Sequence, residues 1–242
     1  MPEYSPVLSI VTAVFELAVA VYAWRAGGRR EVLRLVAALL VFLAGYQVIE
    51  VFVCHDPEAL FWARLAFADV VWLPPLGLAL LYRLAQPTRP IWGRVVVGFF
   101  AIAAFFTFWV FFDDQFVTAS VCKAVIAFYT HPTFALEFYG AFYHLGLWSM
   151  MGAGIHLARR AGTELDRDHA ADLALGTVAF VVLALTTEIV VPAAKEATPS
   201  VMCHYAISLA IFLWRIARRE AMATAARKTN HGDAEARERT DS

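Results

Sequence analysis

The sequence predicts an all-α, polytopic membrane protein with seven transmembrane helices. Of its 242 residues, 60% are hydrophobic and only 17% are charged, whereas about 25% are charged in an ordinary soluble domain. The apolar residues gather in runs of roughly 20, the length that a helix needs to cross the hydrocarbon core. Arginines are concentrated in alternate connecting loops, as expected of a protein with a fixed orientation in the bilayer. The bilayer is therefore part of the solvent.

Each predicted span is an apolar run bounded by charge, glycine or proline. The N-terminus lacks the basic start of a cleavable signal peptide, and neither end carries a lipidation motif. Pro74 and Pro75 lie inside the third span, where they remove backbone donors and predict a kink. In chain order, the predicted spans cover Pro6–Trp24, Val32–Val53, Ala59–Leu81, Trp92–Phe112, Ala135–Leu157, Ala170–Val191 and Pro199–Trp214.

Loop charge predicts the orientation of the bundle. Arginines flank the first, third and fifth loops and follow the last span, while the intervening loops hold mainly acids with Lys123 and Lys195. Cytoplasmic loops carry the excess of Lys and Arg, so we expect the N-terminus outside and the C-terminus inside. Residues 1–219 form the predicted bundle, and residues 220–242 a charged, partly disordered cytoplasmic tail. The expected location is the plasma membrane, as a bacterial inner-membrane protein.

The longest predicted outer loop, Asp113–Phe134, is too apolar for a solvated linker. It predicts a lid or hairpin packed over the outer face of the bundle. Cys54 ends the second span and Cys122 lies in this loop, so in an oxidising compartment a disulfide between them would pin the loop in place. The alternative is that Cys54, Cys122 and Cys203 are three small buried thiols. We favour the disulfide.

Most ionisable residues inside the predicted spans lie in the outer half. A charge at the bilayer centre costs about 2.5–3.5 kcal/mol, so these side chains should face one another around a water-accessible pocket. Gln47, Glu50 and Cys54 share one stripe of the second span, and Glu137 and His144 share one stripe of the fifth. The predicted ligand-binding pocket comprises Gln47, Glu50, Arg64, Asp69, Glu137, His144, Glu188 and His204.

Arg64 and Asp69 point to different faces of the third span, so each needs its own partner. We expect Arg64 to pair with Glu50 or Glu137, and Asp69 to pair with His144. The alternative for Glu50 and Arg64 is an ion pair that only holds two helices together. Glu137 could instead reach the surface, and His144 could be a hydrogen-bonded core residue. The case for a site rests on the shared depth of these residues.

A resemblance adds to this interpretation. The run "EALFWARLAFADVVWLPPLGLALLYRLA" is similar to the third span of the seven-helix N-terminal sensor region found ahead of some bacterial histidine kinases and cyclic-dinucleotide enzymes. The run "FYGAFYHLGLWSMMGAGIHLARRA" resembles the fifth span of those regions, and together the resemblance covers about half of the chain. It implies a seven-helix sensor fold, although no kinase or cyclase follows here. The matching element consists of Trp62, Arg64, Leu65, Pro74 and Pro75.

The first functional hypothesis is a receptor-like sensor that binds a small ligand or ion in the outer pocket. Its output would pass to a cytoplasmic or membrane signalling partner, because the predicted tail is too short for an output domain. The bilayer is the other expected partner, an oligomer is compatible with the sequence, and nothing supports nucleic-acid binding. The ligand and any catalysis are left open by the sequence.

Two further hypotheses stay open. His144 and His204 could ligate haem or, with Glu137, a divalent metal in a redox enzyme, although no strict metal motif such as H-E-x-x-H is present. A transporter or proton channel could use Glu16, Asp69 and Glu188, although no inverted repeat is visible. A retinal pigment is not expected, since the last span has no lysine to form a Schiff base.

Overall fold

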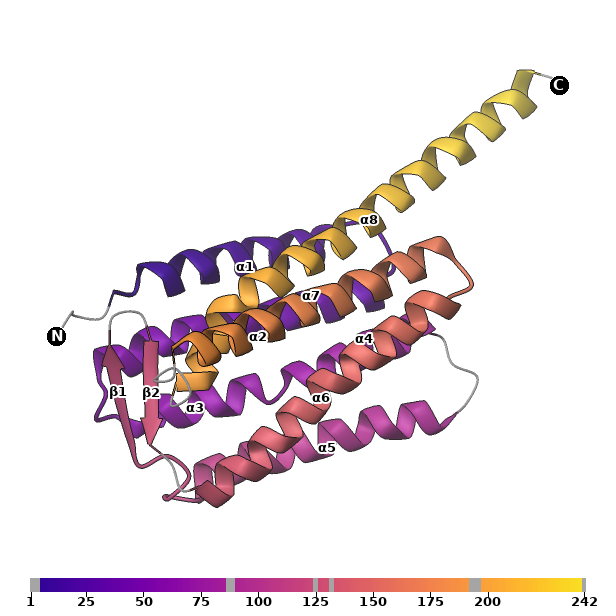
Figure 1. The fold of residues 1–242 in the computed structure, drawn as a ribbon. Coiled ribbons are helices and arrows are strands. Elements are labelled where there is room, and N and C mark those ends of the chain that lie inside the picture. Colours follow the sequence, from indigo (N-terminus) through magenta and orange to yellow (C-terminus); the bar gives the residue numbers. More distant parts are fainter. Residues whose placement is uncertain (1–4, 86–89, 124–125, 131–132, 192–196, 241–242) are drawn as a thin grey trace.

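The chain folds into a bundle of helices with a β-hairpin at one end (Figure 1). The computed structural model describes residues 5–85, 90–123, 126–130, 133–191 and 197–240. The helices are α1 (Val7–Arg25), α2 (Arg30–His55), α3 (Leu60–Val70), α4 (Leu73–Ala85), α5 (Pro90–Phe112), α6 (Thr133–Arg160), α7 (Glu164–Val190) and α8 (Thr198–Thr240), and the strands are β1 (Ala119–Lys123) and β2 (Ile126–Thr130).

The all-α prediction is confirmed, and the composition of the helices makes the chain a multi-pass membrane protein. Six helical stretches in the described part of the chain are long and apolar enough to cross a membrane, and α3 with α4 counts as one of them. α6 is not among the six, but it lies within the bundle and packs against α4 and α7. Phe105, Phe108 and Phe112 on α5 are exposed, which suits a lipid solvent and not water.

The third predicted span is broken and not merely kinked. α3 ends at Val70, a turn follows, and α4 begins again at Leu73. Pro74 and Pro75 fall in the first turn of α4, where the missing N–H groups would have no helical partner. The hydroxyl of Tyr139 on α6 donates to the carbonyl of Phe67 at 2.5 Å. The break removes a backbone donor from this part of the helix, and the Tyr139 hydroxyl donates to the Phe67 carbonyl instead.

The predicted outer loop contains the hairpin that its apolar composition suggested. β1 and β2 pair antiparallel, with Cys122 opposite Ala127. The hairpin packs against α2, α3 and α8, and Figure 1 places it at the end of the bundle that also holds the start of α1. Cys54 and Cys122 form a disulfide with their Cα atoms 5.4 Å apart, the pair that the sequence favours, whereas Cys203 is a free, buried cysteine.

The last helix is longer than predicted. The predicted span ends at Trp214, but α8 continues as helix to Thr240 and projects beyond the bundle (Figure 1). The predicted tail, residues 220–242, therefore begins inside this helix. Alanine-rich sequence after Glu220 favours continuation, and Glu220 itself is buried against the α1–α2 connection.

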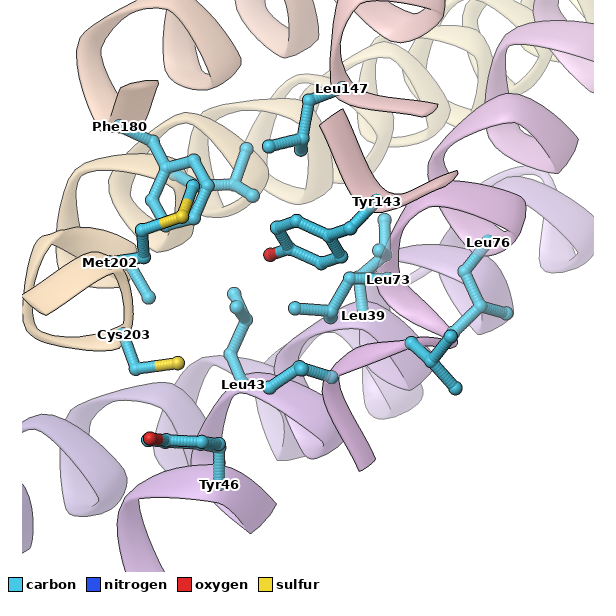
Figure 2. Packing of buried hydrophobic residues seen from close by; sticks show 14 of the residues in the cluster. Leu39, Leu43, Tyr46, Leu73, Leu76, Tyr143, Leu147, Phe180, Met202 and Cys203 are labelled. Atoms are coloured by element: carbon cyan, nitrogen blue, oxygen red, sulfur yellow. The ribbon is translucent and has the colours of Figure 1, made fainter. Parts of the chain in front are cut away.

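Closely packed apolar side chains fill most of the bundle interior. Figure 2 shows Tyr143 of α6 and Cys203 of α8 directed into the same space beside Leu43 of α2. On α6, Gly146 lies so close to Pro74 that no side chain would fit there. The Pro74 ring therefore packs directly against the backbone of α6 at Gly146.

Candidate functional site

The strongest concentration of buried polar contacts at the hairpin end joins α2, β2 and α8. We call Gln47, Glu50, Ala127, Ser200 and Cys203 the hairpin junction. Ser200 donates its hydroxyl to Glu50 Oε1 at 2.7 Å and accepts the backbone N–H of Ala127 at 3.1 Å. One turn along α2, the Gln47 amide donates to the carbonyl of Cys203 at 2.5 Å. A hairpin strand and two helices are therefore hydrogen-bonded at one point.

Local sequence explains this convergence. Gln47 and Glu50 are three residues apart on α2, so both face α8. Ser200 lies in the first turn of α8, next to the hairpin that the disulfide pins to the end of α2. Gln47, Glu50 and Ser200 are all fully buried. A second contact, between the hydroxyls of Tyr46 and Tyr129 at 3.2 Å, ties α2 to β2 one turn below Glu50.

The hairpin junction contains acceptors that lack a donor. Gln47 Oε1 and Glu50 Oε2 are buried and have no hydrogen-bond partner within the described part of the chain. A buried acceptor without a donor costs roughly 1–3 kcal/mol, and more where it is charged. Chemically, the junction therefore suits a bound group that offers N–H, O–H or positive charge.

Arg64 does not take part in this junction, contrary to the predicted pairing with Glu50 or Glu137. Its guanidinium forms an ion pair with Asp114 at 3.1 Å and also donates to the Asp114 carbonyl. Arg64 lies one turn into α3 at the hairpin end, and Asp114 follows the end of α5 there. A long side chain reaches the polar surface at little cost, so Arg64 turns outward and not toward the core.

The predicted pair of Asp69 and His144 is also wrong. Asp69 lies against α2, so close to Gly45 that a β-carbon there would sit 2.8 Å from Asp69 Oδ1. His144 donates from its Nδ1 to the carbonyl of Gly140, one turn earlier in its own helix, at 2.7 Å. The two residues lie on the broken span and on α6, and helix rotation turns their polar atoms toward different neighbours.

Of the remaining residues predicted to line the pocket, one lies near the hairpin junction and one does not. His204 donates from Nδ1 to the Ser200 carbonyl at 2.7 Å, and its Nε2 has no hydrogen-bond partner within the described residues. Glu137 is exposed on α6. The side chain of Glu188 lies outside the described residues. The junction thus retains Gln47 and Glu50, with His204 nearby on α8.

Glu16 is a separate buried acid. Its side chain is fully buried on α1, and neither carboxyl oxygen has a hydrogen-bond partner within the described residues. Asp69 is close enough to interact electrostatically with Glu16. The described residues contain no group of three or more His, Cys, Asp and Glu side chains placed to hold a metal ion, so His144, His204 and Glu137 do not form one.

A second polar cluster, which the sequence argument missed, lies at the opposite end of the bundle and centres on Arg29. The Arg29 backbone N–H and Nε donate to the Glu220 carboxylate at 3.0 and 2.7 Å. Nη1 donates to Asp166 at 2.5 Å, and Nη2 lies 3.1 Å from His169 Nδ1. We call Arg29, Asp166, His169 and Glu220 the Arg29 cluster; it joins the α1–α2 connection to α7 and α8.

Local structure prepares this cluster. Thr163 caps α7 by accepting the backbone N–H of Asp166 at 3.1 Å, which orients the Asp166 side chain at the helix start. Gly28 has a φ of +156°, and a β-carbon there would lie 2.9 Å from Glu220. Burial lowers the pKa of Arg29, but hydrogen bonds and attraction from Glu220 and Asp166 outweigh it, so that pKa is raised. Arg29 is therefore permanently charged.

Further ion pairs join α7 to α8 beside this cluster. Asp172, which is buried, pairs with Arg215 at 3.2 Å and with Arg219 at 3.1 Å, while Arg219 also reaches Asp168 at 3.0 Å. The sequence signal was the spacing of acids at 166, 168 and 172 on one helix and of arginines at 215 and 219 on the next.

Comparison with known proteins gives no family assignment. No protein-family model matches the chain, and no curated protein matches it with significance.

Proposed function

We propose that this protein is a stand-alone integral membrane sensor of the plasma membrane. In this proposal the chain has seven spans, with the N-terminus and the hairpin outside and the C-terminus inside, as the loop charges predict. It binds a small ligand or ion at the hairpin junction and passes the change through α8 to a signalling partner. The resemblance of Glu58–Ala85 to kinase sensor regions agrees with this role.

A single observation carries the proposal: one continuous helix connects both polar clusters. α8 bears Ser200 in the hairpin junction and Glu220 in the Arg29 cluster. At 1.5 Å per residue, these positions are about 30 Å apart along one rigid element. A tilt or rotation imposed on α8 at Ser200 therefore reaches Glu220, and α8 continues beyond the bundle, where a partner can contact it.

The polar atoms of the junction favour a particular class of ligand. Among the described residues, Gln47 Oε1 and Glu50 Oε2 have no hydrogen-bond donor, so a small cation or a ligand that donates a hydrogen bond would satisfy them. The disulfide-pinned hairpin lies directly over these residues, with β2 bonded to Ser200. Ligand binding would compete for the Ser200–Glu50 hydrogen bond and so act on α8 at its first turn.

The experiment perturbs the hairpin end and measures the opposite end. Spin labels are attached at Ile91→Cys on α5 and Ala225→Cys on α8, two exposed positions, in a Cys203→Ala background that retains the Cys203 carbonyl. The distance distribution between the labels is measured by electron spin resonance in liposomes. We expect Ser200→Ala to shift or broaden this distribution, because α8 loses its anchor on Glu50 and Ala127.

Thr186→Ala on α7 is the matched control. The Thr186 hydroxyl is exposed and bonds only the carbonyl of Val182 in its own helix, so its loss should leave the distribution unchanged. If Ser200→Ala gives the same distribution as Thr186→Ala while both variants remain folded, α8 does not couple the two ends and the sensor proposal fails.

A further inference from the structure

We propose that Arg29 is a latch that holds α8 docked in the resting state, and that opening this latch releases the projecting part of α8 for its partner. The inference rests on the proposed function and assigns the regulatory step to a residue outside the ligand site. Its basis is the geometry of the Arg29 cluster.

Among the described residues, Arg29 is the arginine whose side chain forms ion pairs with two different helices. It lies in the α1–α2 connection and bonds α7 through Asp166 and α8 through Glu220. The other described ion pairs at this end join only two elements, such as Arg219 on α8 with Asp168 and Asp172 on α7. Removing Arg29 therefore breaks the ion pair between α8 and the α1–α2 connection, while the pairs of α8 with α7 remain.

Glu220 is placed where a latch is effective. It is buried under the α1–α2 connection, and a β-carbon at Gly27 would lie 3.4 Å from Thr224, one turn further along α8. Beyond these contacts the helix leaves the bundle (Figure 1). Opening at Glu220 frees the projecting segment without separating the apolar part of α8 from its neighbours.

The chemistry of Arg29 suits a contact that is either closed or open. Its planar guanidinium presents several donors in one fixed arrangement, and here it satisfies two carboxylates on two helices. If α8 turns, Glu220 loses the backbone N–H and the side-chain donors of Arg29 together. The geometry thus favours two discrete states of α8 over a continuous range of positions.

The test uses the labels at Ile91→Cys and Ala225→Cys with changes in the latch. Arg29→Lys keeps the charge but cannot reach Glu220 and Asp166 with the same set of donors, and Glu220→Gln keeps the shape of the acceptor. We expect both variants to add a longer-distance population that wild type lacks. Monodisperse elution and an unchanged helical circular-dichroism signal establish that each variant is folded.

Arg83→Ala is the matched control, because Arg83 forms an exposed ion pair at 3.1 Å with Glu31, which joins α4 to α2 and not to α8. If Arg29→Lys and Glu220→Gln match Arg83→Ala, the latch is overturned, even if Ser200→Ala still alters the distribution and the sensor proposal stands. If the latch variants release α8 but Ser200→Ala does not, Arg29 is a latch in a protein whose two ends are not coupled. The two proposals can therefore fail separately.

Discussion

Ser200 shows how one small side chain can connect three elements of a membrane bundle. Its hydroxyl donates to Glu50 on α2 and accepts from Ala127 on β2, while its own backbone belongs to α8. A hydroxyl both donates and accepts, so no apolar residue of similar size can replace it. The buried Glu50 carboxylate depends on this contact, because its other oxygen has no partner within the described residues.

We predict that Ser200→Ala lowers the free energy of unfolding by about 1–3 kcal/mol, the range for leaving buried polar groups unpaired. The measurement is thermal unfolding of the purified protein in detergent, followed by tryptophan fluorescence. Thr186→Ala provides the control, because the exposed Thr186 hydroxyl bonds only its own helix. Equal midpoints for the two variants would contradict the role assigned to Ser200.

At the scale of elements, the hairpin and the broken span differ in how far sequence could predict them. The apolar composition of the loop between two spans predicts the hairpin, and Cys54 at the end of α2 predicts its attachment through Cys122. The break between α3 and α4 depends on packing as well as on Pro74 and Pro75. It needs Tyr139 to bond the Phe67 carbonyl and Gly146 to admit Pro74.

The disulfide should contribute measurably to stability. Cys54 and Cys122 are separated by 68 positions, and closing a loop of that length contributes about 4 kcal/mol in the chain-entropy model. A membrane retains structure in the unfolded chain, so we expect Cys54→Ser to cost up to about this amount. The readout is a lower unfolding temperature in detergent that added reductant does not lower further.

Cys203→Ala is the control for the disulfide, because Cys203 is free and buried. This variant should keep the sensitivity of wild type to reductant. The wild type is also treated with reductant, and mass spectrometry shows whether the disulfide is reduced. If the disulfide is reduced and the unfolding temperature does not change, the disulfide does not stabilise the protein through the hairpin.

At the scale of the whole molecule, the bundle has two chemically different ends. The hairpin end carries the disulfide and the junction around Glu50, and the opposite end carries the arginine ion pairs. Cytoplasmic loops carry the excess of Arg and Lys, which predicts that the Arg29 end lies inside. A disulfide persists in an oxidising compartment, which agrees with the proposal that the hairpin lies outside.

This orientation predicts which positions a membrane-impermeant maleimide can reach. In a Cys203→Ala background, Gln115→Cys before the hairpin should be labelled in intact cells. Gly162→Cys, in the α6–α7 connection, should be labelled only after the membrane is permeabilised. Both positions are exposed, so access differs only through the bilayer. The reverse pattern would invert the orientation and place the projecting part of α8 outside.

The chain's local patterns were sufficient for its fold class and for the position of most of its helices. Apolar run length and loop charge are properties of neighbouring residues, so the helices, the hairpin region and the disulfide pair could be anticipated before any contact was known. Which polar groups meet is a different matter. Arg29 and Glu220 are 191 positions apart, and Glu50 met Ser200 while Arg64 turned away to Asp114. Those contacts depend on how each helix is rotated about its axis and on which helix lies beside it. Only the packing of the complete bundle decides these rotations and neighbours.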